Sequence, residues 1–274
     1  MNWKPISFTD RGDNNTFRFI LGNEIAIDAA KSGNISPWPD GSRFAKIAWQ
    51  REIGRDGLLY PGKFVQVELM VKDAKGQQEN EGWAWGRWRS LELKPYGKDA
   101  TFVKECTGCH KPMKDDDYVY TMPLTQATVS RNEVVNNRAA ILPDGLPQQP
   151  LGWNAITMYV DPRSRTISCL YGNDGAMHAI NDWKIHSSDM SATLTYPPGA
   201  IMSLVTWSER DDPHWFGARI PDKVESVEFV QVVNATRMDY HRFTGTQTTE
   251  DRLQQNFEEQ RIKFILALKP AALP

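Results

Sequence analysis

The sequence predicts an α+β protein in which several short β-strands and a few helices form two tandem related domains. Short segments with alternating apolar residues, separated by glycine and proline turns, are typical of strands. The order of these signals in the first half returns in the second half, which indicates a duplicated domain. The 274 residues suffice for two domains of ordinary size.

The alternating segments of the first half predict strands over residues 16–21, 42–51, 64–71, 82–88 and 118–122. Residues 1–16 are polar and predict irregular structure. We expect a short helix over 24–31 and a second helix that begins near residue 100 or 101. One face of the strand over 82–88 is aromatic and the other is nearly bare backbone, which a flat cofactor could approach closely.

Four short matches, in the same order, relate the second half to the first. They are Leu21–Glu24 with Tyr171–Asp174, Pro39–Gly41 with Pro197–Gly199, Trp49 with Trp207, and Phe64–Val67 with Phe229–Val232. We therefore expect a domain over residues 1–125, a proline-rich linker over 126–152, and a second domain over 153–274 that ends in a helix over 251–268. In this comparison Leu204 takes the place of Lys46.

Residues 106–110, Cys-Thr-Gly-Cys-His, have the spacing of a c-type haem attachment site. Cys106 and Cys109 would each form a thioether with a haem vinyl group, and His110 would bind the iron. A zinc site would need two more ligands, and a dithiol redox pair would need a thioredoxin-like context that is not visible. The only other cysteine, Cys169, is expected to be an inert core thiol. We expect one covalently attached haem c, in the first domain only.

The sixth iron ligand decides the function, and the sequence leaves it open. Every other histidine lies in the second half, so a second histidine ligand would come from there. Met70, Met113 or Met122 could supply a thioether, which would indicate electron transfer, although a methionine in an apolar strand is more often part of the core. The remaining alternative is an open or water-bound iron suited to small molecules.

Lys46 is expected to share a strand face with the apolar Phe44 and Ala48. Buried lysines are uncommon unless they are paired or functional. The alternative is a lysine at a sheet edge whose ammonium group reaches water.

Residues 211–221 are dense in aspartate, proline, glycine and aromatic residues. They predict either a binding loop near the haem or an ordered structural loop. In the structural loop, which we favour, Trp215 and Phe216 pack and Arg219 pairs with Asp211 or Asp212.

The composition excludes several classes of partner. The net charge of −2 gives no reason to expect nucleic acid or an anionic membrane as partner, and no apolar run approaches the ~20 residues of a membrane span. Residues 1–5 begin no signal peptide, whereas haem is attached covalently outside the cytoplasm. We therefore expect a mature or recombinant form of an exported, periplasmic protein.

Four motifs resemble those of the cytochrome P-460 family, whose relatives include the cytochromes c′-beta. They are F-x-x-I-L-G-N at 17–23, P-D-G at 39–41 with a lysine five residues later, V-K-D-A-K at 71–75, and the haem motif with K-D-D-D-Y-V-Y-T at 114–121. The resemblance covers roughly residues 5–125, with a looser echo over 153–235.

This resemblance implies an antiparallel sheet with a few helices, a homodimer, and a haem with an open distal side. In P-460 members a lysine is covalently tied to a haem meso carbon and the enzyme oxidises hydroxylamine; Lys46 stands at the matching position. The c′-beta members lack that bond and bind nitric oxide behind an apolar pocket. The resemblance therefore implies a haem oxidoreductase acting on hydroxylamine or nitric oxide with a partner cytochrome, or a non-enzymatic protein for nitric oxide binding or electron transfer.

Overall fold

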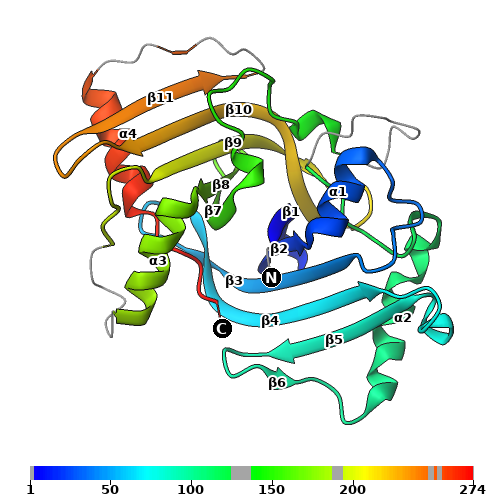
Figure 1. Cartoon of the computed structure of the whole chain (residues 1–274). Coiled ribbons are helices and arrows are strands. Elements are labelled where there is room, and N and C mark those ends of the chain that lie inside the picture. The colour runs from blue at the N-terminus through cyan, green and yellow to red at the C-terminus, as the bar shows by residue number, and fades with distance from the viewer. Residues whose placement is uncertain (1–2, 125–136, 187–193, 246–249, 252–254, 274) are drawn as a thin grey trace.

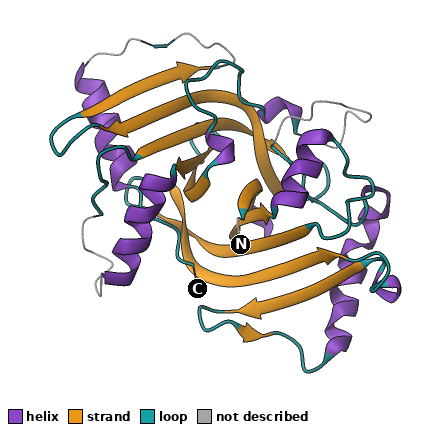
Figure 2. Cartoon of the chain, viewed as in Figure 1, coloured by secondary structure: helices purple, strands orange, loops and turns teal. Residues whose placement is uncertain are grey.

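The computed structural model describes residues 3–124, 137–186, 194–245, 250–251 and 255–273. Within these ranges an 11-stranded sheet forms the centre of the molecule (Figure 1), and every strand pair in it is antiparallel. Four α-helices lie around the strands (Figure 2). The expected fold class, a mainly antiparallel sheet with a few helices, is therefore confirmed.

The strands are β1 (Lys4–Arg11), β2 (Thr16–Gly22), β3 (Arg43–Ile53), β4 (Leu59–Lys72), β5 (Trp83–Arg89), β6 (Lys94–Pro95), β7 (Asn154–Asp161), β8 (Thr166–Gly172), β9 (Ile201–Asp211), β10 (Ala218–Val232) and β11 (Met238–Thr244). The helices are α1 (Glu24–Ser32), α2 (Val103–His110), α3 (Asp174–His186) and α4 (Gln255–Ala267).

Eight of these strands close into a ring. Their order is β3-β2-β1-β10-β9-β8-β7-β4, and β4 pairs with β3 again. All eight contribute buried side chains to one apolar cluster, which includes the fully buried Trp49 and Trp207. Because strand residues alternate between faces, the other face of each strand points out of the ring, where helices α1, α3 and α4 pack on parts of it.

The two halves of the chain repeat the same order of elements: β1-β2-α1-β3-β4-β5 in the first and β7-β8-α3-β9-β10-β11 in the second. The β1–β2 and β7–β8 pairs have an irregularity at the same place, and so do the β3–β4 and β9–β10 pairs. Asn23 and Asn173 make the same bonds to helix and turn. The predicted domain boundaries stay predictions, because both halves share one sheet.

One of the four sequence matches is out of register. Phe64 lies opposite Trp49, and the residue opposite Trp207 is Val224 rather than Phe229. The structural equivalent of Phe64 is therefore Val224. A match of four residues alone is therefore too short to define the register of a strand.

Two predictions about the first half are wrong. Residues 4–11 form β1 rather than irregular structure, because Ile6 and Phe8 are fully buried and the strand pairs with β2 and β10. Residues 118–122 form no strand: Tyr118 has a left-handed backbone conformation (φ 65°), and its carbonyl bonds a histidine ring instead of a neighbouring strand.

The other predicted elements of the first half are confirmed within a few residues. The predicted C-terminal helix is α4, although residues 252–254 lie outside the described residues. Of the predicted linker, 126–136 also lies outside them, whereas the part from residue 137 packs its Leu142 and Leu146 into the ring core. Cys169 is fully buried, and burial raises the pKa of its thiol, as expected of a core thiol. No described helix is long and apolar enough to cross a membrane.

Asn23 should contribute to stability, because its side chain connects α1 to the following turn. Its Oδ1 accepts bonds from the backbone N–H groups of Ala26 (3.1 Å) and Arg43 (3.0 Å), and its Nδ2 donates to Gly41 O (2.9 Å). We expect Asn23→Ala to lower the free energy of unfolding by about 2 kcal/mol. Asn23→Asp keeps the accepting oxygen and should lose less. Urea denaturation of both variants measures this; equal losses would contradict it.

Candidate functional site

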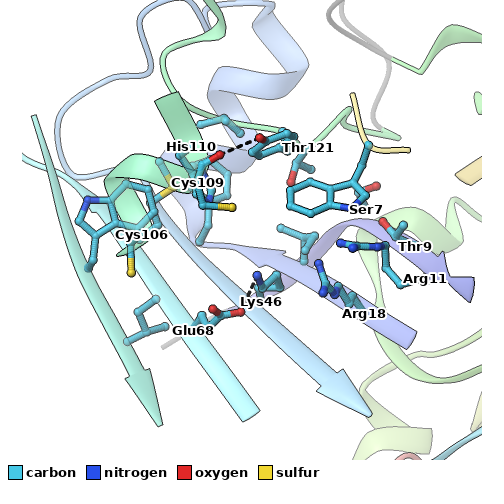
Figure 3. Close-up of a pocket in the computed structure, with 18 of the residues that line it drawn as sticks. Ser7, Thr9, Arg11, Arg18, Lys46, Glu68, Cys106, Cys109, His110 and Thr121 are labelled. Carbon is cyan, nitrogen blue, oxygen red and sulfur yellow. Dashed lines mark hydrogen bonds and ion pairs between the residues drawn. The ribbon is translucent and has the colours of Figure 1, made fainter. Parts of the chain in front are cut away.

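A cavity lies between the outward face of β1–β5 and helix α2 with the segment 119–122 that follows it (Figure 3). It contains about 1090 Å³ of empty space, part of it open to solvent. Charged side chains from strands β1 to β5 line one wall, and these are Arg11, Arg18, Lys46, Glu68 and Arg87.

The predicted haem-binding residues face this cavity together. Cys106, Cys109 and His110 lie on α2, which places both thiols and the imidazole along the same wall. The described structure contains no disulfide between them. The spacing C-x-x-C on a helix separates the two sulfur atoms by about one turn, which suits attachment to two neighbouring groups of one ligand.

The His110 ring is held in one orientation. Its Nδ1 lies 2.6 Å from the carbonyl oxygen of Tyr118, so Nδ1–H donates and Nε2 keeps a free lone pair. The rings of Trp85 and Tyr120 flank it, with centroids 4.6 and 5.2 Å away. Burial lowers the pKa of His110 to about 4, so the imidazole is neutral near pH 7 and can bind a metal ion.

Lys46 belongs to a row of side chains across the sheet. In register, Ile20, Lys46, Glu68 and Arg87 come from β2, β3, β4 and β5. Glu68 accepts from Lys46 Nζ (2.5 Å) and from Arg87 Nε (2.8 Å). Because β3 has a partner on both sides, the alternative of a lysine at a sheet edge is wrong.

The pKa values of this pair shift in the same direction for different reasons. Burial lowers the pKa of Lys46, against the opposing effect of Glu68. Burial would raise the pKa of Glu68, but the nearby Lys46 and Arg87 charges hold it below its ordinary range. Glu68 is therefore an anion between two cations, and Lys46 is an amine that loses its proton more easily than usual.

The sequence did not single out Arg11 and Arg18, although both line the cavity. Arg11 is buried and its Nη2 lies 2.5 Å from Asp13 Oδ2. The Nε of Arg18 is buried without a hydrogen-bond partner, and burial lowers the pKa of this guanidinium to about 10. The alternation of β2 could have located Arg18 from the sequence, because it places Arg18 on the same face as Ile20.

The loop between β9 and β10 brings the second half of the chain to the cavity. Asp212 and Trp215 line it; the Trp215 ring packs against Tyr120 (4.8 Å between centroids) and lies 4.1 Å from Arg11 Cζ. His214 Nδ1 donates to Tyr120 O (2.9 Å). Asp212 has no ion pair in the described structure, and burial raises its pKa.

Both interpretations of residues 211–221 were partly correct. The loop is ordered, and Arg219 pairs with Asp211 (3.7 Å), as the structural interpretation expected. Phe216 does not pack, since 98% of it is exposed. The binding-loop interpretation, which we did not favour, correctly placed part of the loop beside the predicted haem residues.

Two further predictions concern the strand over residues 82–88 and the three candidate methionine ligands. The aromatic face of the strand over 82–88 meets the cavity through Trp85 and Arg87, and Gly86 of the bare face also lines it. The side of Gly86 on which a Cβ would lie is covered by the Trp88 ring, 2.6 Å away. Met70 and Met122 line the cavity, whereas Met113 is buried outside its lining.

Residues 1–121 match the family model of cytochrome P460. None of the curated proteins matches the chain. The first part of the chain is thus a cytochrome P460 family domain, and membership of that family implies a haem cofactor. The match includes Lys46 and His110 but ends before the second-half residues Asp212 and Trp215.

The residues present fit a haem. Two free thiols and an imidazole with a free Nε2 share one wall of a large, partly aromatic cavity. A buried Arg18 nitrogen without a partner faces the same space, as expected where an anionic group of a ligand would bind.

Removing the Glu68 charge should destabilise the protein, because Lys46 and Arg87 would then face each other unneutralised. We expect Glu68→Gln to lower the free energy of unfolding at pH 7 by about 3 kcal/mol. A depressed carboxyl pKa stabilises the fold above the unfolded-state pKa, so the difference from wild type should shrink as the pH falls below about 4.

The control is Glu105→Gln, since Glu105 also approaches Arg87 (3.7 Å) but its side chain is 57% exposed. It should change stability by less than about 0.5 kcal/mol. Urea unfolding of both variants between pH 3 and 7 measures this, and equal effects would contradict the role of Glu68.

Proposed function

We propose that the protein is an exported mono-haem c protein that oxidises hydroxylamine or processes nitric oxide at an open side of the haem. The observation that carries this proposal is that Cys106, Cys109 and His110 face the same cavity as Lys46, inside a cytochrome P460 family domain. The bound haem would supply an iron that changes oxidation state and binds small nitrogen compounds.

The chain's own residues would hold and tune that group. Cys106 and Cys109 would form the two thioether links, and His110 would bind the iron through Nε2. The bond from His110 Nδ1 to Tyr118 O would keep the ring oriented and its Nε2 basic. Trp85 and Tyr120 would restrict rotation of the imidazole.

Lys46 is the candidate for a third covalent link to the haem. A lysine must be neutral to act as a nucleophile, and burial lowers the pKa of Lys46. The bond to Glu68 fixes the position of its Nζ. These two features support the crosslink that the family resemblance implies.

Asp212 is suited to accept protons from a bound substrate. Oxidation of hydroxylamine releases protons together with electrons, so the site needs a base. Glu68 is neutralised by two cations, whereas Asp212 lacks an ion pair in the described structure and its pKa is raised by burial. Asp212 is therefore the better proton acceptor of the two carboxylates in the cavity.

A partner cytochrome would accept the electrons, and covalent attachment of haem would place the protein in the periplasm. The homodimer that the resemblance implies stays a prediction.

The second candidate function is non-enzymatic nitric oxide binding or electron transfer. Met70 and Met122 favour it, because both line the cavity and could bind the iron through a thioether. A methionine-ligated spectrum would exclude the open site that the first function needs.

The Lys46 crosslink predicts a ferrous Soret band shifted strongly to the red, and a haem peptide that contains Lys46 in addition to Cys106 and Cys109. Lys46→Arg keeps a cation beside Glu68 but cannot form the same link, so it should show an ordinary c-type spectrum and lose hydroxylamine oxidation. Absorption spectra, peptide mass spectrometry and an assay with an artificial electron acceptor measure this. An ordinary wild-type spectrum would disprove the crosslink.

The thioether links predict a distinct result for each cysteine. Cys106→Ala should leave haem attached through Cys109 alone, which shifts the pyridine haemochrome band and adds one free vinyl group to the haem peptide. Cys169→Ala is the matched control, because this thiol is buried in the ring core, and it should keep the wild-type band. Identical bands for wild type and Cys106→Ala would contradict attachment at Cys106.

A further inference from the structure

The repeat provides an internal comparison for the residues of the cavity. In the first half, Glu68 lies between Lys46 and Arg87 on the neighbouring strands. In the second half, Glu228 lies between Leu204 and Arg242 in the same way. The carboxylate and the arginine thus recur in the second half, and the lysine does not.

Besides Lys46, Arg18 is a charged residue of the cavity whose counterpart in the second half carries no charge. It lies opposite Thr9 in β1, and the residue in the same place of the second half is Ser168, opposite Tyr159. Ser168 bonds the hydroxyl of Thr206 (2.9 Å). A small, satisfied hydroxyl in one half therefore corresponds to a long guanidinium in the other.

The second half also shows how this fold covers its carboxylate when no ligand site is needed. Arg261 of α4 forms a two-pronged ion pair with Glu228 (2.7 and 2.8 Å), and Tyr240 donates to the same carboxylate (2.7 Å). Apolar residues of α4 pack against that face. The equivalent face of the first half stays open as the cavity.

No carboxylate forms an ion pair with Arg18 in the described structure, although the charges of Glu68 and Asp13 act on it from a distance. Asp13 pairs with Arg11, and Glu68 pairs with Lys46 and Arg87. The strand neighbours of Arg18 in register, Thr9 and Ala48, carry no charge. The Nε of Arg18 is buried without a hydrogen-bond partner.

An unpaired, largely buried guanidinium is unfavourable for folding, since it loses water without gaining a partner. The fold could avoid this cost with a small residue, as Ser168 demonstrates. A ligand that brings its own negative charge would recover the lost interaction. A planar guanidinium suits planar oxyanions in particular, because two parallel N–H groups can bond two oxygen atoms.

We propose that Arg18 is the anion-binding residue of the cavity and takes a planar oxyanion, either a carboxylate or nitrite. This inference rests on the proposed haem attachment. One source of the anion is a haem propionate: Arg18 and Cys106 lie on opposite sides of the cavity (Figure 3), and the propionates of a haem lie at the edge opposite its vinyl groups. The other source is a free nitrogen oxyanion bound next to the iron.

The test uses the purified haem-loaded protein with Arg18→Gln and Arg18→Lys. If the anion is free nitrite, Arg18→Gln should weaken nitrite binding about ten- to hundredfold. The affinity for imidazole, a neutral ligand, should not change. Spectral titration measures both affinities. If the anion is a propionate, both affinities are retained. The pKa seen in the pH dependence of the reduction potential then rises by about one unit or more, because the propionate loses its cation.

Arg18→Lys keeps the charge without the two-pronged geometry, so its effect should be smaller than that of Arg18→Gln. If the glutamine variant does not fold, Arg18→Lys still tests the proposal. The matched control is Arg51→Gln, which removes a mostly buried arginine that pairs with Asp10 (3.0 Å) outside the cavity lining. It should change neither ligand affinity nor the pH dependence.

The outcomes separate this inference from the proposed function. A purified protein without covalently bound haem would overturn both. Haem-loaded Arg18 variants with wild-type nitrite affinity and a wild-type pH dependence of the potential would overturn the role of Arg18 alone.

Discussion

The structure depends on joining the two halves of the chain into one closed ring of eight strands. The end of β1 pairs with β10 at Asp10 and Arg11, and the start of β4, beyond the part that β5 covers, pairs with β7 at Leu59, so backbone groups at these strand edges are not left unpaired. Closure directs one face of every ring strand into a single core around Trp49 and Trp207. The second half is therefore part of the same sheet, and the outward faces remain for other uses.

The outward faces of the two halves differ in how the buried carboxylate on each face is covered. Glu228 is covered by α4, whose Arg261 neutralises it, and its row contains the apolar Leu204. Glu68 is neutralised by Lys46 within the sheet, and α2 stands away from that sheet and leaves a cavity. The difference follows from which element covers the carboxylate. In the open half, the β9–β10 loop adds Trp215 at the wall of the cavity.

The local patterns predicted most of the first half because they depend on neighbours in sequence. Alternation located β2 to β5, and the C-x-x-C-H motif located three residues that line the cavity. The predictions were wrong where contacts with residues distant in sequence determine the local structure. Residues 4–11 become a strand only because β2 and β10 lie beside them. Residues 118–122 are held by histidine side chains, although their alternation is typical of a strand.

The sequence by itself determined the haem motif, the family of the first domain and the antiparallel class of fold, since these follow from residue spacing. Only the tertiary structure decided that Lys46 meets Glu68 and that Arg18 remains unpaired. It also placed Asp212, far along the chain, at the same cavity. Ion pairs and burial depend on which faces the closed ring brings together, and no local pattern in the chain records that arrangement.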